Sequence, residues 1–264
     1  MSAFDELMAF QRQTEALAQV AGRLGWDQET VMPEGSAGQR AEEIGALEGV
    51  LHARRTEPRI AGWLKAAKAP DAAGEAQLRL IRRSHARTMK VPAKLAEEIA
   101  TTMSLAQGVW AEHRAKEDVA GFLPTLRKVV ELKRAEGAAL AAGGDPYDAL
   151  VDDYEPGMTG AAIAAMFDAM RPRLVALREK VLGATPAKGL VGTFGRDDQM
   201  ALSRELATVF GYDWNRGRVD LAVHPFSSGS GHDVRITTRV SETDPFNCFY
   251  STIHEVGHAA YEQG

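Results

Sequence analysis

Apolar residues recur at the spacing of amphipathic helices through most of this chain, and this pattern limits the fold more than any other feature of the sequence. The helical spacing extends over roughly the first two hundred residues. Alanine-rich segments at 137–142 and 160–169 favour helix intrinsically, and the alternation typical of strands is nearly absent before residue 215. Segments containing proline or glycine separate the predicted helices at residues 32–35, 90–92, 143–146 and 155–157. The sequence therefore predicts a mainly α fold without an internal repeat.

The pattern changes in residues 218–240. Two segments rich in β-branched residues, 219–223 and 234–238, are separated by a serine- and glycine-rich segment at 227–231. We expect a small antiparallel β ribbon here. The glycines resemble a phosphate-binding loop only superficially, because no helix N-terminus and no Gly-Lys-Ser/Thr element follows them. The chain is divided accordingly into a helical N-terminal region, 1–214, and a region with the ribbon and a final helix, 215–264.

The final helix is predicted from Asp244, which can cap its N-terminus, and from Pro245 at its first position. Its expected apolar face consists of residues that recur at helical spacing: Phe246, Phe249, Ile253, Val256 and Ala260. A neighbouring stripe with a spacing of four carries Tyr250, His254 and His258. The pattern thus predicts two histidines on one face of a helix with an apolar back.

His254, Glu255 and His258 form the His-Glu-x-x-His pattern of zinc peptidases. Residues four apart lie on one face of a helix, so both imidazoles can reach one cation about 2 Å away, with Glu255 beside them as a base. The pattern also occurs by chance in helical proteins, where both histidines belong to an ordinary core or a solvated face. We assign His254 and His258 as metal ligands and Glu255 as the catalytic residue, with a pair of core histidines as the alternative.

A zinc site of this kind needs a third protein ligand. The extended form of the motif requires glycine at position 261 and histidine at position 264, where this chain has Tyr261 and Gly264, so that class is excluded. Glu262 lies four residues past His258 and hence about 6 Å further along the helix axis, too far for a tetrahedral metal. We expect the third ligand upstream of the motif or in sequence that this chain does not contain.

Composition and charge exclude several classes of function. With 264 residues and 45% hydrophobic content, the chain has the composition of an ordinary globular protein. Its net charge of −5, without a basic stripe, argues against nucleic acid, and no stretch approaches the roughly eighteen apolar residues of a membrane span. The N-terminus has no signal-peptide pattern, so we expect a cytoplasmic protein with no membrane partner. The single cysteine, Cys248, is expected to be a packed side chain rather than a nucleophile.

Residues in and beside the predicted ribbon suit a peptide partner. An edge strand can pair with an extended peptide and hold it over a metal, although a purely structural hairpin is the alternative. Arg235 can clamp a carboxylate with its guanidinium, or it can pair with Asp233 on the same strand face. His224 after the first strand, with Phe226 in the following loop, suits the wall of a cleft, although a lone histidine is more often structural.

Several motifs, in the same order along the chain, resemble those of the thermostable zinc metallocarboxypeptidases of the carboxypeptidase Taq type. The chain has the family's His-Pro-Phe at His224, Pro225 and Phe226, its Asp-x-Arg-x-Thr at Asp233, Arg235 and Thr237, and its zinc motif at residues 254–258. Residues 26–28, 32–33 and 147–157 also resemble family segments. The resemblance covers essentially the whole chain, but only about the N-terminal half of the family's usual length.

The resemblance implies a mostly helical fold with a deep groove, a divalent metal that is Zn2+ or sometimes Co2+, a homodimer when full length, and release of C-terminal residues from peptide substrates. It also implies that the residues of the first two motifs bind substrate. The family's later motifs, one of which carries the glutamate that is the third zinc ligand, have no counterpart here. We therefore expect residues 215–264 to start a catalytic region that is incomplete, and this chain alone to have negligible activity.

Two rival functions stand beside the metallocarboxypeptidase. An oligoendopeptidase of similar helical architecture would cut peptides internally, but Arg235 and His224 favour action at the C-terminus. A non-catalytic helical interaction module would keep the groove wall without the chemistry, and the missing third ligand is its best support.

Overall fold

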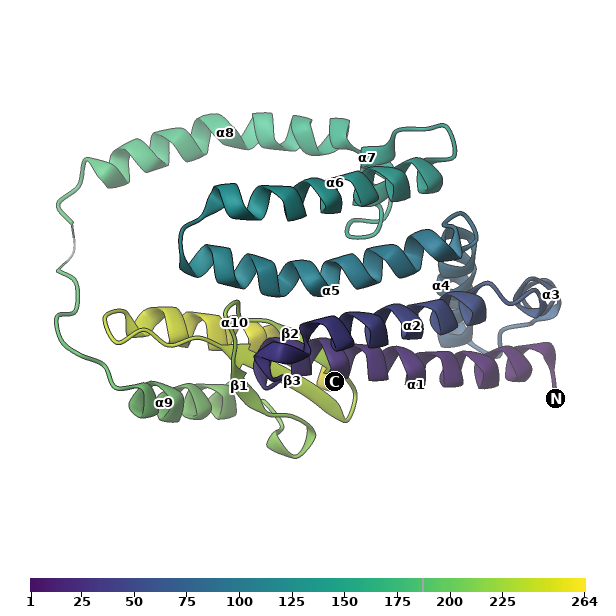
Figure 1. Ribbon diagram of the computed structural model, residues 1–264, viewed down its shortest axis with the longest axis horizontal. Helices are drawn as coiled ribbons and strands as arrows, with labels where there is room; N and C mark the ends of the chain where they lie inside the picture. The colour runs from purple at the N-terminus through teal and green to yellow at the C-terminus, as the bar shows by residue number, and fades with distance from the viewer. Residues whose placement is uncertain (187) are drawn as a thin grey trace.

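The computed structural model describes residues 1–186 and 188–264, and it is mainly helical, as predicted (Figure 1). The α-helices are α1 (Ala3–Thr30), α2 (Ala37–Arg55), α3 (Arg59–Ala66), α4 (Ala72–Thr88), α5 (Ala93–Ala115), α6 (Val119–Ala141), α7 (Pro146–Val151), α8 (Gly160–Leu182), α9 (Arg196–Val209) and α10 (Pro245–Gln263). Short 3-10 helices are η1 (Glu34–Ser36) and η2 (Trp214–Arg216). Within the described residues, no helix has the length and apolar character needed to cross a bilayer.

Helices α1, α4, α6 and α7 end at the four predicted segments that contain proline or glycine, whereas the breaks after α2, α3 and α5 were not predicted. Ser2 starts α1 with a capping box: its hydroxyl accepts from the Asp5 amide at 3.2 Å, and the Asp5 carboxylate accepts from the Ser2 amide at 3.0 Å. Asp145 caps α7, and Pro146 occupies the first helical position, where no intrahelical donor is needed. Helix α6 stops at Ala142, whose left-handed φ of 49° turns the chain out of the helix.

Four of the longer helices lie side by side, in the order α1, α2, α5 and α6, each packed against the next (Figure 1). Helix α8 runs along the outer side of α6 in the view of Figure 1. It differs from the other long helices because none of its residues is buried. The apolar side chains of α8 therefore do not pack into a hydrophobic core within the described residues.

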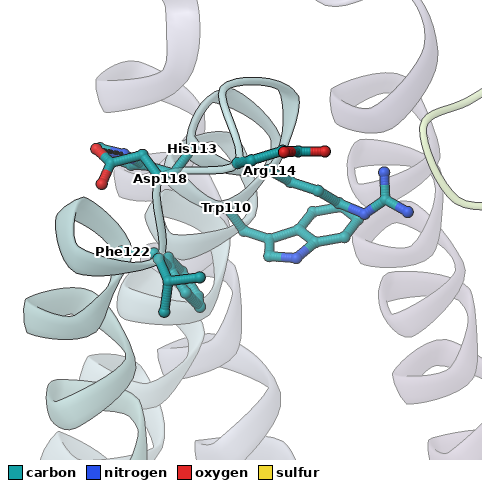
Figure 2. Close-up of a pocket in the computed structure, with 7 residues that line it drawn as sticks. Trp110, His113, Arg114, Asp118 and Phe122 are labelled. Atoms are coloured by element: carbon teal, nitrogen blue, oxygen red, sulfur yellow. Dashed lines mark hydrogen bonds and ion pairs between the residues drawn. The ribbon is translucent and has the colours of Figure 1, made fainter.

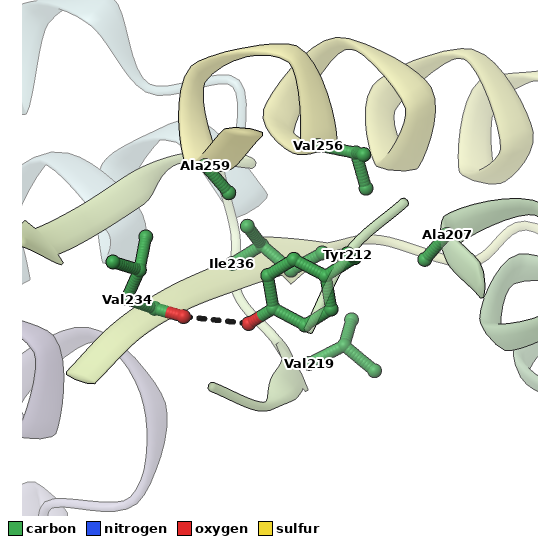
Figure 3. Close-up of a cluster of buried hydrophobic side chains, with 7 residues drawn as sticks. All are labelled: Ala207, Tyr212, Val219, Val234, Ile236, Val256 and Ala259. Carbon is green, nitrogen blue, oxygen red and sulfur yellow. Dashed lines mark hydrogen bonds between the residues drawn. The ribbon is translucent and has the colours of Figure 1, made fainter. Parts of the chain in front are cut away.

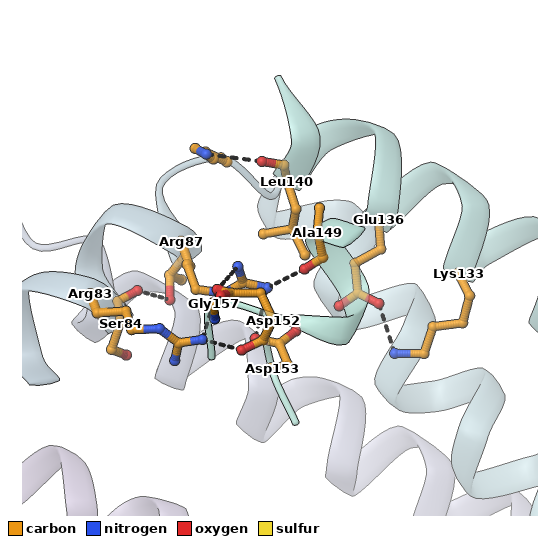
Figure 4. A network of polar contacts seen from close by, with 12 residues as sticks. Arg83, Ser84, Arg87, Lys133, Glu136, Leu140, Ala149, Asp152, Asp153 and Gly157 are labelled. Carbon is orange, nitrogen blue, oxygen red and sulfur yellow. Dashed lines mark hydrogen bonds and ion pairs between the residues drawn. The ribbon is translucent and has the colours of Figure 1, made fainter. Parts of the chain in front are cut away.

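A polar network fixes the chain just before α8 (Figure 4). Arg83 and Arg87 of α4 each donate to a carboxylate oxygen of Asp152, at 2.8 and 2.9 Å, and Arg87 also donates to the Ala149 carbonyl at 2.8 Å. The amide of Gly157 and the Arg83 guanidinium both hold the pKa of Asp152 below its ordinary value. The network ties α7 to α4 and stops short of α8.

Three short strands form a sheet in the order β1 (Val219–Leu221), β3 (Asp233–Thr238), β2 (Ser227–Ser230). The expected antiparallel ribbon is present, but β2 and β3 form it, and the first predicted strand pairs with β3 in parallel on the other side. The segment that sequence reasoning treated as a linker is therefore itself a strand. Its close approach to β3 requires glycine, because Gly229 has φ of +90° and a Cβ there would lie 1.9 Å from the Asp233 carbonyl oxygen.

Two clusters of buried side chains support the fold. The N-terminal cluster joins α1, α3 and α4 and consists of Leu7, Ile60, Leu64 and Leu78. The sheet cluster lies between α9, the sheet and α10 and consists of Ala207, Tyr212, Val219, Val234, Ile236, Val256 and Ala259 (Figure 3). The Tyr212 hydroxyl lies 2.6 Å from the Val234 carbonyl oxygen and 3.1 Å from that of Arg218. The sheet cluster draws side chains from both sides of residue 214, and the division of the chain at that residue stays a prediction.

Candidate metal centre on helix α10

Helix α10 begins as the sequence predicts, but it buries a different face. The Asp244 carboxylate accepts from the Phe246 amide at 3.2 Å, and Pro245 occupies the first turn. Phe246 is 46% exposed, although it was expected in the apolar back. The buried residues of the helix are instead Pro245, Cys248, Thr252, Glu255, Val256, Ala259 and Gln263. Apolar character alone selected the wrong stripe because several of these buried side chains are polar.

Polar contacts hold this buried face in place. The Thr252 hydroxyl donates to the Cys248 carbonyl at 2.8 Å and lies 3.1 Å from the Thr238 hydroxyl of β3. At the other end, the Gln263 amide group accepts from the Asp213 amide at 2.9 Å and donates to the Asp213 carbonyl at 3.1 Å. Cys248 itself is buried, as expected of a packed side chain. Sequence reasoning missed Thr252 and Gln263, although both follow the four- and three-residue spacing of Val256 and Ala259.

The two motif histidines lie together on the exposed face of α10. Their Nε2 atoms are 3.2 Å apart, and the rings meet nearly edge to face, with an interplanar angle of 82°. Neither histidine is buried, so they do not form the core pair that was the alternative. Two nitrogens about 2.0–2.1 Å from one tetrahedral zinc ion are separated by about 3.3 Å. The observed pair therefore fits two adjacent ligand positions of such a metal.

Glu255 lies beside the histidine pair but points to the covered side of the helix. Its side chain is only 6% exposed. Burial raises the pKa of the Glu255 carboxyl above its ordinary value, and the nearby His254, His258 and His224 oppose that rise. A raised pKa makes the carboxylate a stronger base, which suits a residue that accepts a proton.

A third protein ligand is not found beside these two histidines. Within residues 1–186 and 188–264, no group of three or more His, Cys, Asp or Glu side chains is placed so that it could hold a metal ion. Glu262, Asp233 and His224 are therefore not gathered with His254 and His258 in this structure. The structure brings together two imidazoles and a carboxylate, and their assignment as metal ligands and catalytic base stays a prediction.

The His-Pro-Phe segment is fastened to the central strand. The Phe226 amide donates to the Thr237 hydroxyl at 2.8 Å, and the Thr237 amide donates to the Phe226 carbonyl at 2.8 Å. Pro225 is buried, whereas His224 is exposed. Thr237 therefore fixes the position of the segment that carries His224, which lies within electrostatic range of Glu255 on α10. Whether these residues bind substrate stays a prediction.

Glu29 of α1 is a second half-buried carboxyl group near His224, and sequence reasoning missed it. Burial raises the pKa of Glu29, while a hydrogen bond from Gln107 and the charge of His224 oppose the rise. Because the His224 charge acts on both Glu29 and Glu255, the histidine lies within electrostatic range of α1 and α10. The only sequence signal for Glu29 is its place directly after the family-like segment at residues 26–28.

Arg235 adopts the pairing that was one of its two predicted roles. Its Nε and Nη2 donate to the two carboxylate oxygens of Asp233 at 2.8 and 3.0 Å. The guanidinium also lies over the Trp26 ring, with its carbon 4.2 Å from the ring centroid. Strand β3 and helix α1 are thereby joined through this arginine. Its other role, as a clamp for a peptide carboxylate, stays a prediction.

A cavity with aromatic side chains in its lining lies elsewhere, at the turn between α5 and α6 (Figure 2). Its volume is about 480 Å³, and Trp110, Arg114 and Phe122 line it together with His113 and Asp118. His113 and Asp118 are paired at 3.0 Å, and the Asp118 carboxylate also caps α6. None of the predicted site residues lines this cavity.

Comparisons with known proteins agree with the motifs. A family model described as carboxypeptidase Taq (M32) metallopeptidase matches residues 6–264. Thermostable carboxypeptidase 1 of Thermus thermophilus is 36% identical over 283 aligned residues, which cover 100% of this chain and 55% of that protein. The crystal structure of the M32 carboxypeptidase from Deinococcus radiodurans matches with a TM-score of 0.83 at 32% identity, and the BsuCP crystal structure with 0.93 at 27%. Each alignment covers 99% of this chain and 54% of the solved one.

The fold and the match over nearly its whole length place this chain in the carboxypeptidase Taq (M32) family of metallopeptidases. The resemblance drawn from the motifs is confirmed, and so is its extent. The chain spans about half the length of the relatives it matches.

Proposed function

We propose that this chain supplies two metal ligands and the catalytic base of a metallocarboxypeptidase that releases amino acids from the C-termini of peptides. The observation that carries this proposal is the pair of exposed Nε2 atoms, 3.2 Å apart on α10, next to the buried Glu255. Zinc, or cobalt in its place, is the metal that two imidazoles and a further carboxylate would suit. When bound, such a metal polarises the scissile carbonyl and lowers the pKa of water toward ~7.

Proton transfer and substrate orientation are assigned to different residues of the chain. The Glu255 carboxylate takes the proton of the attacking water and delivers it to the leaving amine. His224, held through the Phe226–Thr237 hydrogen bonds, and Arg235 on β3 orient the C-terminal end of the peptide. The relatives are nearly twice as long, so their additional chain is where we place the third ligand. A homodimer of the complete fold, located in the cytoplasm, belongs to the same proposal.

Metal binding tests the site in the chain itself. Zinc titrated into the purified 264-residue protein should bind one ion per chain, weakly, because two imidazoles and water replace three protein ligands. His258→Ala should abolish that binding, whereas His232→Ala, which removes an exposed histidine from the β2–β3 turn, should leave it unchanged. Equal binding by the protein and the His258→Ala variant would remove the ligand assignment.

The direction of cleavage tests the reaction. In a hybrid that joins the unmatched part of the Thermus relative after Gly264, residues should leave one at a time from a free peptide C-terminus. Glu255→Gln should abolish turnover with metal still bound, and an amidated peptide should resist cleavage because it lacks the terminal carboxylate. Equal internal cleavage of amidated and free peptides would favour the oligoendopeptidase. The 264-residue chain alone should release almost nothing, and robust release would show that this chain completes the metal site by itself.

A further inference from the structure

Helix α8 carries a continuous apolar seam that begins at the partly buried Ile163 and is exposed in the described structure from Phe167 to Val181. The seam residues recur alternately four and three apart: Ile163, Phe167, Met170, Leu174, Leu177 and Val181. This is the a/d spacing by which one helix packs along another. Leu174 is 54% exposed and Val181 62% exposed, although leucine and valine at seam positions normally bury.

The seam is also shaped to receive a neighbour. A shallow groove of about 420 Å³ runs along it, lined by Phe167, Met170, Arg171, Leu174, Val175 and Arg178. Pro172 lies inside the helix at the heptad position opposite the seam. A proline at this position removes one backbone hydrogen bond on the face away from the seam. Helices usually curve with that outer face convex, so the concave side faces the element that they cover.

The charges beside the seam select the kind of occupant. The flanking positions carry Arg171 and Arg178 on one side and Arg173 and Lys180 on the other. Among the ion pairs of the described residues, these four cations have one contact, Arg171 to Asp168 at 3.6 Å, and both of its side chains are largely exposed. Two copies of α8 would place cations against cations in either orientation, which is unfavourable. An apolar helix flanked by acidic side chains would instead pair with all four.

We propose that α8 is a docking surface for an amphipathic helix with acidic flanks, and that this helix belongs to the part of the M32 fold outside these 264 residues. The BsuCP structure matches the chain with a TM-score of 0.93, yet the match covers only 54% of that structure. Nearly half of the fold therefore has its place outside this chain. A helix of 23 residues without buried positions is marginal in water, so that missing part supplies the packing α8 lacks.

Two synthetic helical peptides test the chemistry of the occupant. Both have the same apolar seam, and their flanking positions are all glutamate in one and all lysine in the other. The glutamate peptide should bind the 264-residue protein at least about tenfold more tightly and slow amide hydrogen exchange in α8. Leu174→Glu should abolish binding, whereas Ala176→Glu, a similarly exposed position off the seam, should preserve it. The double variant Arg173→Glu, Lys180→Glu should shift the preference toward the lysine peptide.

The hybrid with the Thermus part tests the source of the occupant, and α8 should become protected from exchange in it. If the hybrid unfolds cooperatively while α8 exchanges as fast as in the 264-residue chain, the assigned source is wrong. Equal binding of both peptides, or of neither, would overturn the acidic occupant, and a dimer whose α8 amides are already protected would show that a second copy covers the seam. This proposal rests on family membership and on α8 alone, so its outcome is independent of zinc binding and cleavage.

Discussion

Helices α8 and α10 both present an apolar or aromatic stripe to solvent, but only α10 is anchored on its opposite face. Val256 and Ala259 of α10 enter the sheet cluster, and Thr252 and Gln263 bond to β3 and to residue Asp213. Helix α8 is capped by Thr159 and follows a well-fixed turn, yet it buries nothing. An exposed stripe on an anchored helix can hold side chains at a fixed spacing, as His254 and His258 show. An exposed stripe on a helix without such anchoring becomes buried only when another helix packs against it.

The largest predicted difference between the two helices is the loss of unfolding free energy when one apolar side chain beneath α10 or on α8 is truncated. Ile236→Ala opens a cavity in the sheet cluster beneath α10, where Ile236 is fully buried, and should lower the free energy of unfolding by about 2–5 kcal/mol. Leu174→Ala on α8 removes a half-exposed side chain and should change it by less than about 0.5 kcal/mol. Urea denaturation of both variants measures the difference. Equal losses would mean that α8 is part of the same core.

The second prediction concerns the pH dependence of the free energy of unfolding, which the buried Tyr212 of the sheet cluster should change at alkaline pH. Burial raises the pKa of Tyr212 to about 12, so the folded protein retains this proton at pH values where the unfolded chain, with a tyrosine pKa near 10, has lost it. The folded state binds more protons than the unfolded state between these values. The contribution of Tyr212 to the free energy of unfolding should therefore be fully present below pH 10 and should fall between pH 10 and 12, by about 1.4 kcal/mol per pH unit.

Tyr212→Phe is the matched control for that slope. It should cost about 1–3 kcal/mol at neutral pH because the Val234 and Arg218 carbonyls lose their donor, and it should remove this part of the alkaline loss. An unchanged slope in the variant would assign the alkaline loss to another group.

The helix caps give a smaller and better matched comparison. Asp244 of α10 and Thr159 of α8 each accept from an amide of the first turn at 3.2 Å. Asp244→Ala should lower the global free energy of unfolding by about 1 kcal/mol. Thr159→Ala removes a similar hydrogen bond but should accelerate amide exchange only within α8, because α8 opens without the rest of the fold. A global loss from Thr159→Ala would show that α8 unfolds together with the core.

The smallest predicted effect is a gain. Gly257 lies inside α10 at an exposed position, and apart from its chain neighbours and the nearby backbone of its own helix, a methyl group there would have no atom within 4 Å. Gly257→Ala should stabilise the protein by about 0.5–1 kcal/mol, since glycine loses more backbone freedom than alanine in a helix. Zinc binding should be retained if His254 and His258 depend on the helix for their spacing, and thermal unfolding with and without zinc measures both quantities. Loss of binding in this variant would show that the metal site needs a distortion at residue 257.

The sequence by itself determined the helical fold, the start of α10 and the family. These follow from local features: the segments with proline or glycine at 32–35, 90–92, 143–146 and 155–157 interrupt the helices, Asp244 caps its own helix, and the spacing of His254 and His258 places them on one face. Residue order along the chain is enough for each of these.

Only the tertiary structure decided which faces are covered. The parallel pairing of β1 with β3, the polar buried face of α10 and the stacking of Arg235 on Trp26 all depend on contacts between distant segments. Such contacts let polar side chains such as Thr252 and Gln263 be buried with their hydrogen bonds satisfied, and hydrophobic periodicity does not register them. The apolar spacing of the α8 seam is visible in the sequence. Its exposure is known only from the structure, because an apolar stripe has the same pattern whether or not another helix packs against it.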